Sequence, residues 1–241
     1  QIYPRLLPLI GGSFQFAKVT VIEPQYNIRL SEGFSLFKGL PFTDVLEEIH
    51  VLILSFPEFN VPGLSVMLKD GSLTLLSEEQ RIFGFQNIQA TYKRLSNRTD
   101  FNLKCTSNLW QSITIDGWLN TQKFESKGKI RLARFRPQTL SKYFFPNSTL
   151  KIIDAMANLM IDFETNGPAW FNAHMEGSVP YVNLTHGTKE LVIKDTMIKA
   201  VMQIKRNTAR IKFEELSLYN PRMKWSGTLF IDQDQPQITL D

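Results

Sequence analysis

The stretch that decides the fold is IQATYKRLSNRTDFNLKCTSNLWQSITIDGWL, residues 88–119. It aligns without a gap with IKAVMQIKRNTARIKFEELSLYNPRMKWSGTL, residues 198–229, which begins 110 positions later. Only six of the 32 aligned positions are identical, so the likeness lies in the pattern of apolar residues. In both stretches apolar and polar residues alternate, and a period of two is typical of a strand with one buried face. The pattern therefore predicts a β protein built from repeats.

The same alternation covers most of the remaining chain, with turn-forming residues between the runs. KDGS (69–72), SNRTD (96–100), NTQ (120–122), ETNGP (164–168) and KRNT (205–208) favour tight turns. Strands joined by such short links pair antiparallel. At about 3.3 Å per residue the run 109–119 would extend roughly 35 Å. The clearest alternating runs are 14–21, 66–76, 88–92, 101–105, 109–119, 124–132, 159–163, 171–177, 189–194, 198–204, 209–218 and 223–231.

Helical signals are few and short. PFTDVLEEIH (41–50) and RPQTLSKYFF (136–145) each place apolar residues on one helical face, and TLKIIDAM (149–156) fits a strand or a helix. We therefore expect a mainly β fold of long antiparallel strands in a curved, groove-forming sheet, a half-pipe, with a few short helices. The expected organisation is one elongated unit over 1–241. It consists of an N-terminal β segment with a short helix (1–65), a first β repeat ending in a short helix (66–146) and a second β repeat (147–241).

Composition narrows the function classes. The net charge is +4, but the 27 basic and 23 acidic residues are interleaved, without the basic stripe that nucleic acid requires. Cys105 is the single cysteine, and its position in phase with Phe101 and Leu103 predicts a small core residue. The sequence contains no run of about 18 apolar residues, so it predicts no membrane-spanning helix. The chain starts at Gln1 and ends within an alternating pattern, so we expect a fragment of a longer protein.

Motifs for catalysis are absent from the sequence. His50, His174 and His186 have no second histidine or cysteine at metal-ligand spacing. No nucleophile elbow, phosphate-binding loop or dinucleotide fingerprint occurs. Pairs of glutamates, such as Glu214 and Glu215, are adjacent, and neighbours on a strand point to opposite faces. We expect neither an enzyme nor a protein that holds a metal or cofactor.

Three segments resemble one known family. They are LPLIGGSFQFAKVTVIEPQYNIRL (7–30), the presumed hairpin VMLKDGSLTLL (66–76) and GKIRLARFRPQTLSKYF (128–144), a strand running into a short helix. Their order resembles that of the AsmA-like family of AsmA, TamB and YhdP type, related to the bridge-like lipid transfer proteins. The resemblance implies a protein of the Gram-negative envelope with its β part in the periplasm and an N-terminal helix in the inner membrane. It also implies phospholipid transport towards the outer membrane.

The alternation and the resemblance lead to the same hypothesis. The apolar sides of long strands would line a shared groove that holds acyl chains, while headgroups remain in water. Each buried methylene contributes about 0.8 kcal/mol, and passive carriage needs no catalytic residue. Phospholipid or another acyl lipid is the expected partner, with envelope proteins as further partners and membrane contact through parts outside this chain. The groove candidates are Ile113, Ile115, Leu119, Ile130, Leu132, Leu159, Ile161, Phe163, Ile198, Met202, Ile204, Ile211, Phe213, Met223, Trp225 and Leu229.

Two other readings stay open from the sequence. One is a non-catalytic envelope scaffold with a closed apolar core, which would recruit partners by strand addition at its edges. The other is a glycan-binding β domain that uses Trp110, Trp118, Trp170 and Trp225 as sugar platforms. Each groove candidate would equally suit the plain interior of a β protein.

Overall fold

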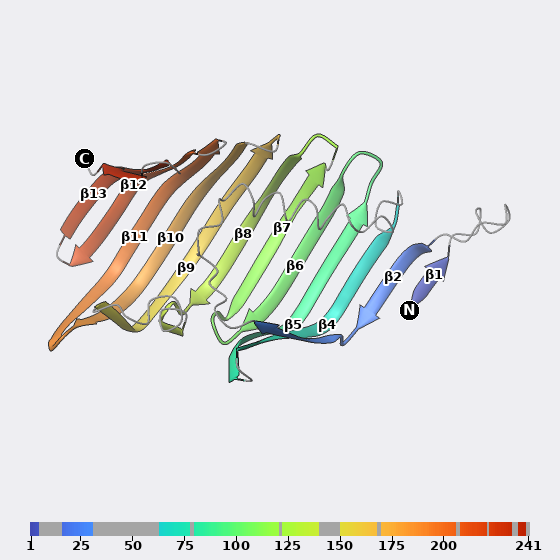
Figure 1. The fold of residues 1–241 in the computed structure, drawn as a ribbon, viewed down its shortest axis with the longest axis horizontal. Coiled ribbons are helices and arrows are strands. Elements are labelled where there is room, and N and C mark those ends of the chain that lie inside the picture. The colour runs from blue at the N-terminus through green and yellow to red at the C-terminus, as the bar shows by residue number, and fades with distance from the viewer. Residues whose placement is uncertain are drawn as a thin grey trace.

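A single sheet contains every strand of the part of the chain that the structure describes. The structure is a computed structural model, and it describes residues 1–4, 16–30, 63–77, 80–120, 122–139, 150–167, 170–205, 208–220, 222–232 and 236–239. Figure 1 shows the strands side by side from one end of the sheet to the other. They are β1 (Ile2–Pro4), β2 (Phe16–Ile22), β3 (Gln25–Leu30), β4 (Ser65–Ser77), β5 (Gln80–Arg94), β6 (Thr99–Ser107), β7 (Ser112–Asn120), β8 (Glu125–Phe135), β9 (Leu150–Asn166), β10 (Trp170–His186), β11 (Lys189–Lys205), β12 (Thr208–Asn220), β13 (Arg222–Asp232) and β14 (Pro236–Thr239).

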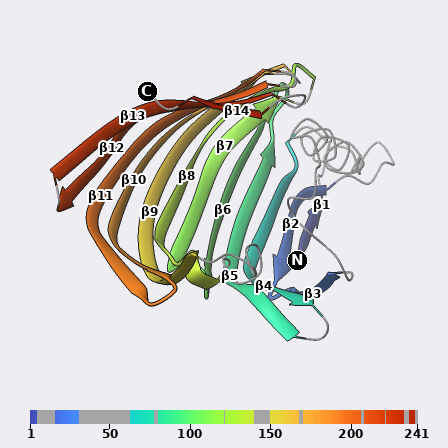
Figure 2. The same cartoon turned by 60° about the vertical axis from the view of Figure 1, so that its left-hand side comes forward.

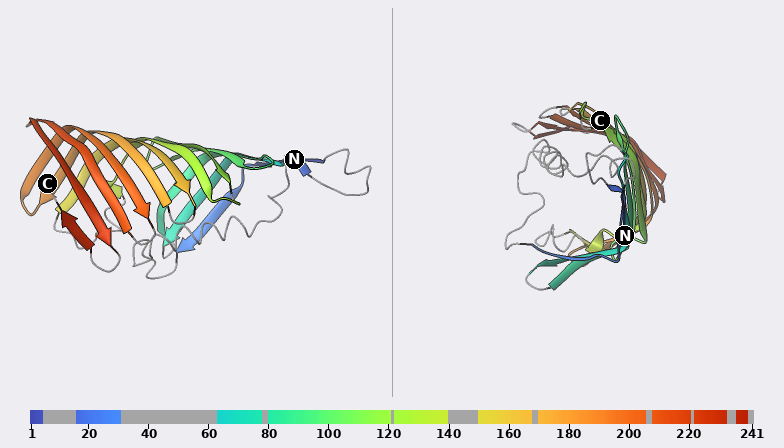
Figure 3. Two further views of the ribbon diagram at one scale, coloured as in Figure 1. Left: turned by 90° about the horizontal axis from the view of Figure 1, so that it is seen from above. Right: turned by 90° about the vertical axis from the view of Figure 1, so that its right-hand side faces the viewer.

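The sheet is open and curved. From β4 to β14 each strand pairs antiparallel with its neighbour in sequence, as short links require. Figure 2 shows the strands bending along their length, and seen end-on in Figure 3 they trace an open arc. The predicted mainly β fold of long antiparallel strands is confirmed. The boundary expected between residues 146 and 147 falls between β8 and β9, which pair directly.

The N-terminal end departs from up-and-down pairing. Both β2 and β3 run parallel to β4, β2 beside its first half and β3 beside its second. Between them the extended conformation is interrupted at Glu23, which has φ 51°, and at Pro24. The backbone N–H of Glu23 donates to Lys69 O, and Ser72 N–H donates to Pro24 O, both at 2.8 Å. The two short strands thus act as one interrupted strand along β4.

Several predicted boundaries were wrong. Residues 69–72 were expected to turn and make 66–76 a hairpin, but β4 continues through them with a bulge at Asp70. The run 109–119 was expected to be one strand, but Leu109 lies buried in the connection between β6 and β7. The two runs 189–194 and 198–204 belong to the single strand β11. Bulges absorb turn-forming residues within long strands because neighbouring strands supply the hydrogen bonds.

Both predicted helices fall outside or at the limit of the described residues. The segment 41–50 is outside them, and of the segment 136–145 only residues through 139 are described. The ambiguous segment 149–156 enters β9 and is a strand from Leu150 onward.

The two aligned stretches occupy β5–β7 and β11–β13. Ala90 pairs with Leu103, and the aligned Ala200 pairs with Phe213. The next pair of strands differs, because Leu103 pairs with Ile115 whereas Phe213 pairs with Gly227. The register thus agrees in one hairpin and shifts by two residues in the next.

Candidate functional site: the apolar face of the sheet

One face of the sheet carries continuous rows of apolar residues across neighbouring strands. Residues directly opposite each other in an antiparallel pair share a face. The middle row crosses ten strands, β4 to β13, without a polar side chain. It runs Leu68, Ala90, Leu103, Ile115, Ile130, Ile161, Met175, Ala200, Phe213 and Gly227.

Two further rows flank this middle row. One runs Val66, Tyr92, Phe101, Gly117, Gly128, Phe163, Ala173, Met202, Ile211 and Leu229. The other runs Cys105, Ile113, Leu132, Leu159, Gly177, Ile198, Leu216 and Trp225. We call these three rows the apolar face. At a strand spacing of about 4.8 Å, ten strands extend it over roughly 43 Å.

The pairing places all sixteen groove candidates on this side of the sheet. Thirteen belong to the three rows, with Trp225 and Leu229 assigned by backbone register alone. Leu119, Ile204 and Met223 each lie two residues beyond a row along their own strand. The candidate set had omitted members on β5, β6 and β10, such as Ala90, Phe101 and Met175, although the same alternation contains them.

Bulges keep apolar residues on this face where their spacing changes. Phe213 and Leu216 are three apart, which would put them on opposite faces of a regular strand. Their partners Gly227 and Trp225 are two apart on β13, so both remain on one face. A bulge in β8 has the same effect: Leu132 and Phe135 are three residues apart, but their partners Leu159 and Ala157 are two apart, so both remain on one face.

The side chains of the apolar face are only partly shielded from solvent. Fourteen of the sixteen candidates have side chains that the structure describes, and twelve of these are half-buried. Ile204 is buried at 5% exposure and Met223 is exposed at 42%. Most of the described candidates therefore keep partial contact with solvent.

Glycines let neighbouring side chains lie flat on the apolar face. A Cβ at Gly117 would sit 2.9 Å from Phe101 Cζ, and one at Gly128 would sit 2.6 Å from Phe163 Cζ. The Phe163 ring in turn stacks on Phe171, with 6.3 Å between ring centroids. Such rings cover the bare backbone of the adjacent strand.

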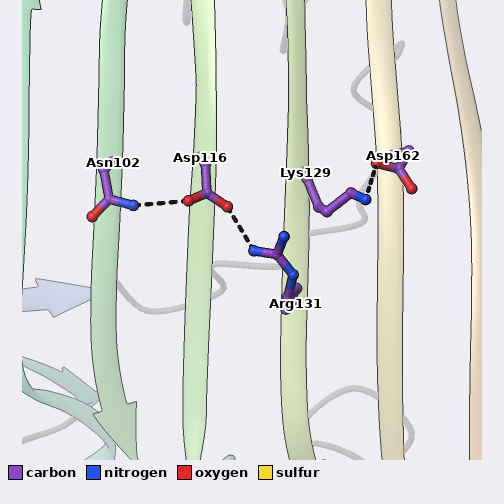
Figure 4. Close-up of polar contacts among 5 residues, drawn as sticks. All are labelled: Asn102, Asp116, Lys129, Arg131 and Asp162. Atoms are coloured by element: carbon purple, nitrogen blue, oxygen red, sulfur yellow. Dashed lines mark hydrogen bonds and ion pairs between the residues drawn. The ribbon is translucent and has the colours of Figure 1, made fainter.

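The opposite face is polar and carries alternating charges. Asn102, Asp116, Lys129 and Asp162 are consecutive cross-strand partners there. Figure 4 shows Asn102 Nδ2 donating to Asp116 Oδ1 at 3.0 Å and Lys129 Nζ 3.0 Å from Asp162 Oδ1. Arg131 Nη1 lies 2.9 Å from Asp116 Oδ2. These charged and polar side chains are in contact with solvent, so this face of the sheet is hydrated.

Polar residues border the apolar face at one end of strands β5 to β9. Arg94 pairs with Thr99 on the same side of the sheet as Tyr92 and Phe101. Farther along, Ser126 pairs with Thr165, and their hydroxyl oxygens lie 2.9 Å apart. The apolar rows therefore end against three hydroxyl groups and one guanidinium, with Leu119 between Thr99 and Ser126. Arg94 was missed from the sequence, although it continues the two-residue period of Ala90 and Tyr92.

Arg94 is the buried cation of this border. Its residue exposure is 7%, and that of Thr99 is 1%. Nη1 donates to Thr99 Oγ1 at 3.0 Å, while the buried Nε–H has no acceptor. No carboxylate of the described residues forms an ion pair with it.

The other residues singled out from the sequence are scattered. His174 lies on the polar face beside Arg210, Lys212 and Glu214, where a shallow hollow of about 320 Å³ opens. His186 ends β10, and His50 lies outside the described residues.

The cysteine and the tryptophans have separate places in the sheet. Cys105 is buried, as predicted for a core residue; burial raises the pKa of its thiol, and the neighbouring Trp110 lowers that pKa by less. Trp118 is on the polar face within 5.8 Å of the Arg98 guanidinium. Trp170 begins β10, and Trp225 lies on β13.

Nothing in the described part of the chain gathers three or more metal-ligating side chains. In the same residues no helix has the length and apolar character needed to cross a membrane. No protein-family model, curated protein or solved structure matches the chain.

Proposed function

We propose that this chain binds the acyl chains of lipids on its apolar face and carries them passively. The observation that supports this most is the middle row, which crosses ten strands without a polar side chain. Hydrocarbon tails have no hydrogen-bonding groups, so they fit a surface that offers none. Each methylene withdrawn from water contributes about 0.8 kcal/mol.

The half-burial of the face supports a ligand over a closed core. Apolar side chains open to solvent on a contiguous face mark a binding surface. Among the described residues most side chains of the apolar face are half-buried, while Cys105, Ala173 and Ala200 are buried. The sheet is curved, so one of its two faces is concave. The proposal places the tails inside the curve and the charged face outside.

The wider setting is proposed from the sequence resemblance. In that setting the chain belongs to a periplasmic protein anchored in the inner membrane, and the lipids are phospholipids on their way to the outer membrane. No catalytic step is needed, because the free energy of tail burial lowers the barrier to crossing water.

The test compares two variants of the same strand, one with a charge on the apolar face and one with a charge on the polar face. Ile115 lies between Leu103 and Ile130 in the middle row, whereas the adjacent Thr114 lies on the polar face. Ile115→Asp should remove bound phospholipid from the purified protein in native mass spectrometry, because a carboxylate does not tolerate hydrocarbon contact. Thr114→Asp should keep it. Circular dichroism checks that both variants fold.

A crosslinking experiment tests the same proposal without removing the apolar contact. A photoreactive phenylalanine at Ile161 should label tritiated acyl chains of added phospholipid. At the adjacent Met160, which the pairing places on the polar face, it should not. Equal labelling from both positions, or bound lipid undiminished by Ile115→Asp, contradicts the proposal.

A second candidate function is favoured by the open edges of the sheet. Among the described residues, β1 pairs only with β2 and β14 only with β13. An unpaired edge accepts a strand from another protein, so envelope partners would dock there. A purified chain that carries no lipid but captures a partner, with capture lost on adding Pro at β14, would favour this scaffold function.

A further inference from the structure

We infer that Arg94 binds the anionic headgroup of the lipid whose tails lie on the apolar face. This rests on the proposed function and adds to it the group that recognises the substrate: a guanidinium that binds the phosphate or carboxylate next to the acyl chains. The juxtaposition that carries it is a buried guanidinium, with no carboxylate partner among the described residues, at the end of an apolar surface.

Among the described residues, the hydrogen bonds of Arg94 leave one edge of the guanidinium without an acceptor. Nη1 is held by Thr99 Oγ1 at 3.0 Å. Nε–H is buried without an acceptor, and Nη2 donates to none of the described residues. Nε and Nη2 form the edge with which arginine binds the two oxygens of a phosphate or carboxylate.

Burying a guanidinium without an anionic partner costs free energy. A buried arginine that lacks such a partner among the described residues therefore points to a bound anion. Arg94 is 7% exposed, and a buried charge is normally paired. The remaining protein contacts position it: its backbone N–H donates to Leu64 O at 2.8 Å, and Gly63 N–H donates to its carbonyl at 2.7 Å. The side chain is fixed by Thr99 on one side and presents two donors on the other.

The place of Arg94 on the sheet matches the shape of an anionic lipid. It follows Tyr92 by two residues on β5, and Tyr92 belongs to a row of the apolar face. Tails running over these rows would end at the polar border, where the headgroup meets Arg94. Lys93, the preceding residue, lies on the polar face opposite Asp100.

The experiment compares two soluble lipids that differ by one phosphate. Dioctanoyl phosphatidate and dioctanoylglycerol are titrated into the whole chain below their micelle concentrations. The wild type should bind the phosphatidate on the order of tenfold more tightly or better, as for a charge-assisted two-donor contact. Arg94→Gln should remove this preference and leave the affinity for dioctanoylglycerol unchanged.

Two further variants control for charge and folding. Arg98→Gln in the same turn removes an exposed arginine that pairs with Asp100 at 3.0 Å on the other face, and the preference should persist. Arg94→Lys keeps the charge but not the two-donor edge, and should lose several-fold in phosphatidate affinity. It replaces Arg94→Gln if the latter does not fold.

The outcomes separate this inference from the proposed function. If the wild type binds neither lipid, both are overturned. If it binds both equally, or if the preference survives in Arg94→Gln, the headgroup site is overturned and tail binding stands. If inorganic phosphate at equal concentration binds as tightly as the phosphatidate, Arg94 is a site for free anions, which also overturns the inference.

Discussion

Gly128 is a residue at which the sheet has no room for a side chain. A Cβ there would lie 2.7 Å from the backbone oxygen of Asp116 and 2.6 Å from Phe163 Cζ. At Gly177 the nearest obstacle is Leu159 Cδ2 at 2.6 Å, the end of a flexible side chain, with backbone oxygen at 3.2 Å. The two glycines share a face but differ in what surrounds them.

Gly128→Ala should therefore destabilise the chain more than Gly177→Ala. We expect a loss of about 1–3 kcal/mol in the free energy of unfolding for Gly128→Ala, since the backbone must shift. For Gly177→Ala the expected loss is under about 1 kcal/mol, because the leucine can rotate. Urea denaturation followed by circular dichroism measures both, and equal losses would contradict the geometry.

At the scale of single residues, the sequence indicates which face a residue takes but not what surrounds it. Alternation alone puts Ile113, Ile115, Ile130 and Ile161 on one side. It also puts Arg94 there, but it does not report the burial of Arg94, its side-chain bond to Thr99 or its backbone bonds to residues 63 and 64, which only the fold brings together. Periodicity cannot report such contacts.

At the scale of strands, the bulges let an irregular sequence present a regular face. The extra residue in β12 lies between Phe213 and Leu216, at Glu214 and Glu215. Glu215 pairs with Lys199, and Phe213 pairs with Ala200, so Glu214 has no direct partner on β11. Glu214 is therefore the residue that a regular strand would not contain.

Deleting Glu214 should leave the unfolding free energy within about 1 kcal/mol, because Phe213 and Leu216 then share a face by ordinary alternation. Deleting Lys212 gives a strand of the same length but turns Phe213 to the polar face and Glu214 to the apolar face. That variant should lose on the order of 2 kcal/mol or more. Thermal and urea unfolding compare them, and a Glu214 deletion as damaging as the Lys212 deletion would refute the assignment.

The bulges also explain which strand predictions failed. Asp70, at the bulge of β4, has a positive φ of 53°, and aspartate favours turns. Residues 69–72 were therefore expected to turn within β4, since no local signal tells a bulge from a hairpin when flanking strands supply the hydrogen bonds. The turn around 95–98 was predicted, although the predicted run 88–92 covers only the last part of β5 and the run 101–105 lies within β6.

At the scale of the whole molecule, each strand is stabilised mainly by its two neighbours. Extensive contacts run between strands that pair in the sheet. β9, β10 and β11 have 17 residues each and partners on both sides, whereas β1 has 3 residues and β14 has 4. Stability in such a structure is approximately a sum of nearest-neighbour terms.

Amide hydrogen exchange should therefore fall off from the long strands towards both ends. We expect the backbone amides of β10 to exchange at least about tenfold more slowly than those of β1 and β14. Exchange followed by mass spectrometry of peptides checks this in the native chain. Uniform protection across all strands would instead mean that the sheet opens only as a whole.

The overall form was predictable in kind but not in detail. Alternation and short links lead directly to antiparallel neighbours, and long strands with one apolar side lead to a curved sheet. The parallel pairing of β2 and β3 with β4 was not foreseeable, because it joins segments separated by more than 30 residues of chain. Curvature depends on twist and bulges summed over the sheet, which no single segment encodes.

At each bulge the residues that point to the apolar face switch between odd and even positions. A saturation substitution library would detect this switch as a change in which positions tolerate polar residues. Along β5, odd-numbered positions through Phe85 would resist polar replacement, and even-numbered ones from Ile88 onward would take over. Along β12 the switch would run from odd to even between Phe213 and Leu216. A tolerance map that changes parity at these points would locate these two bulges without any coordinates.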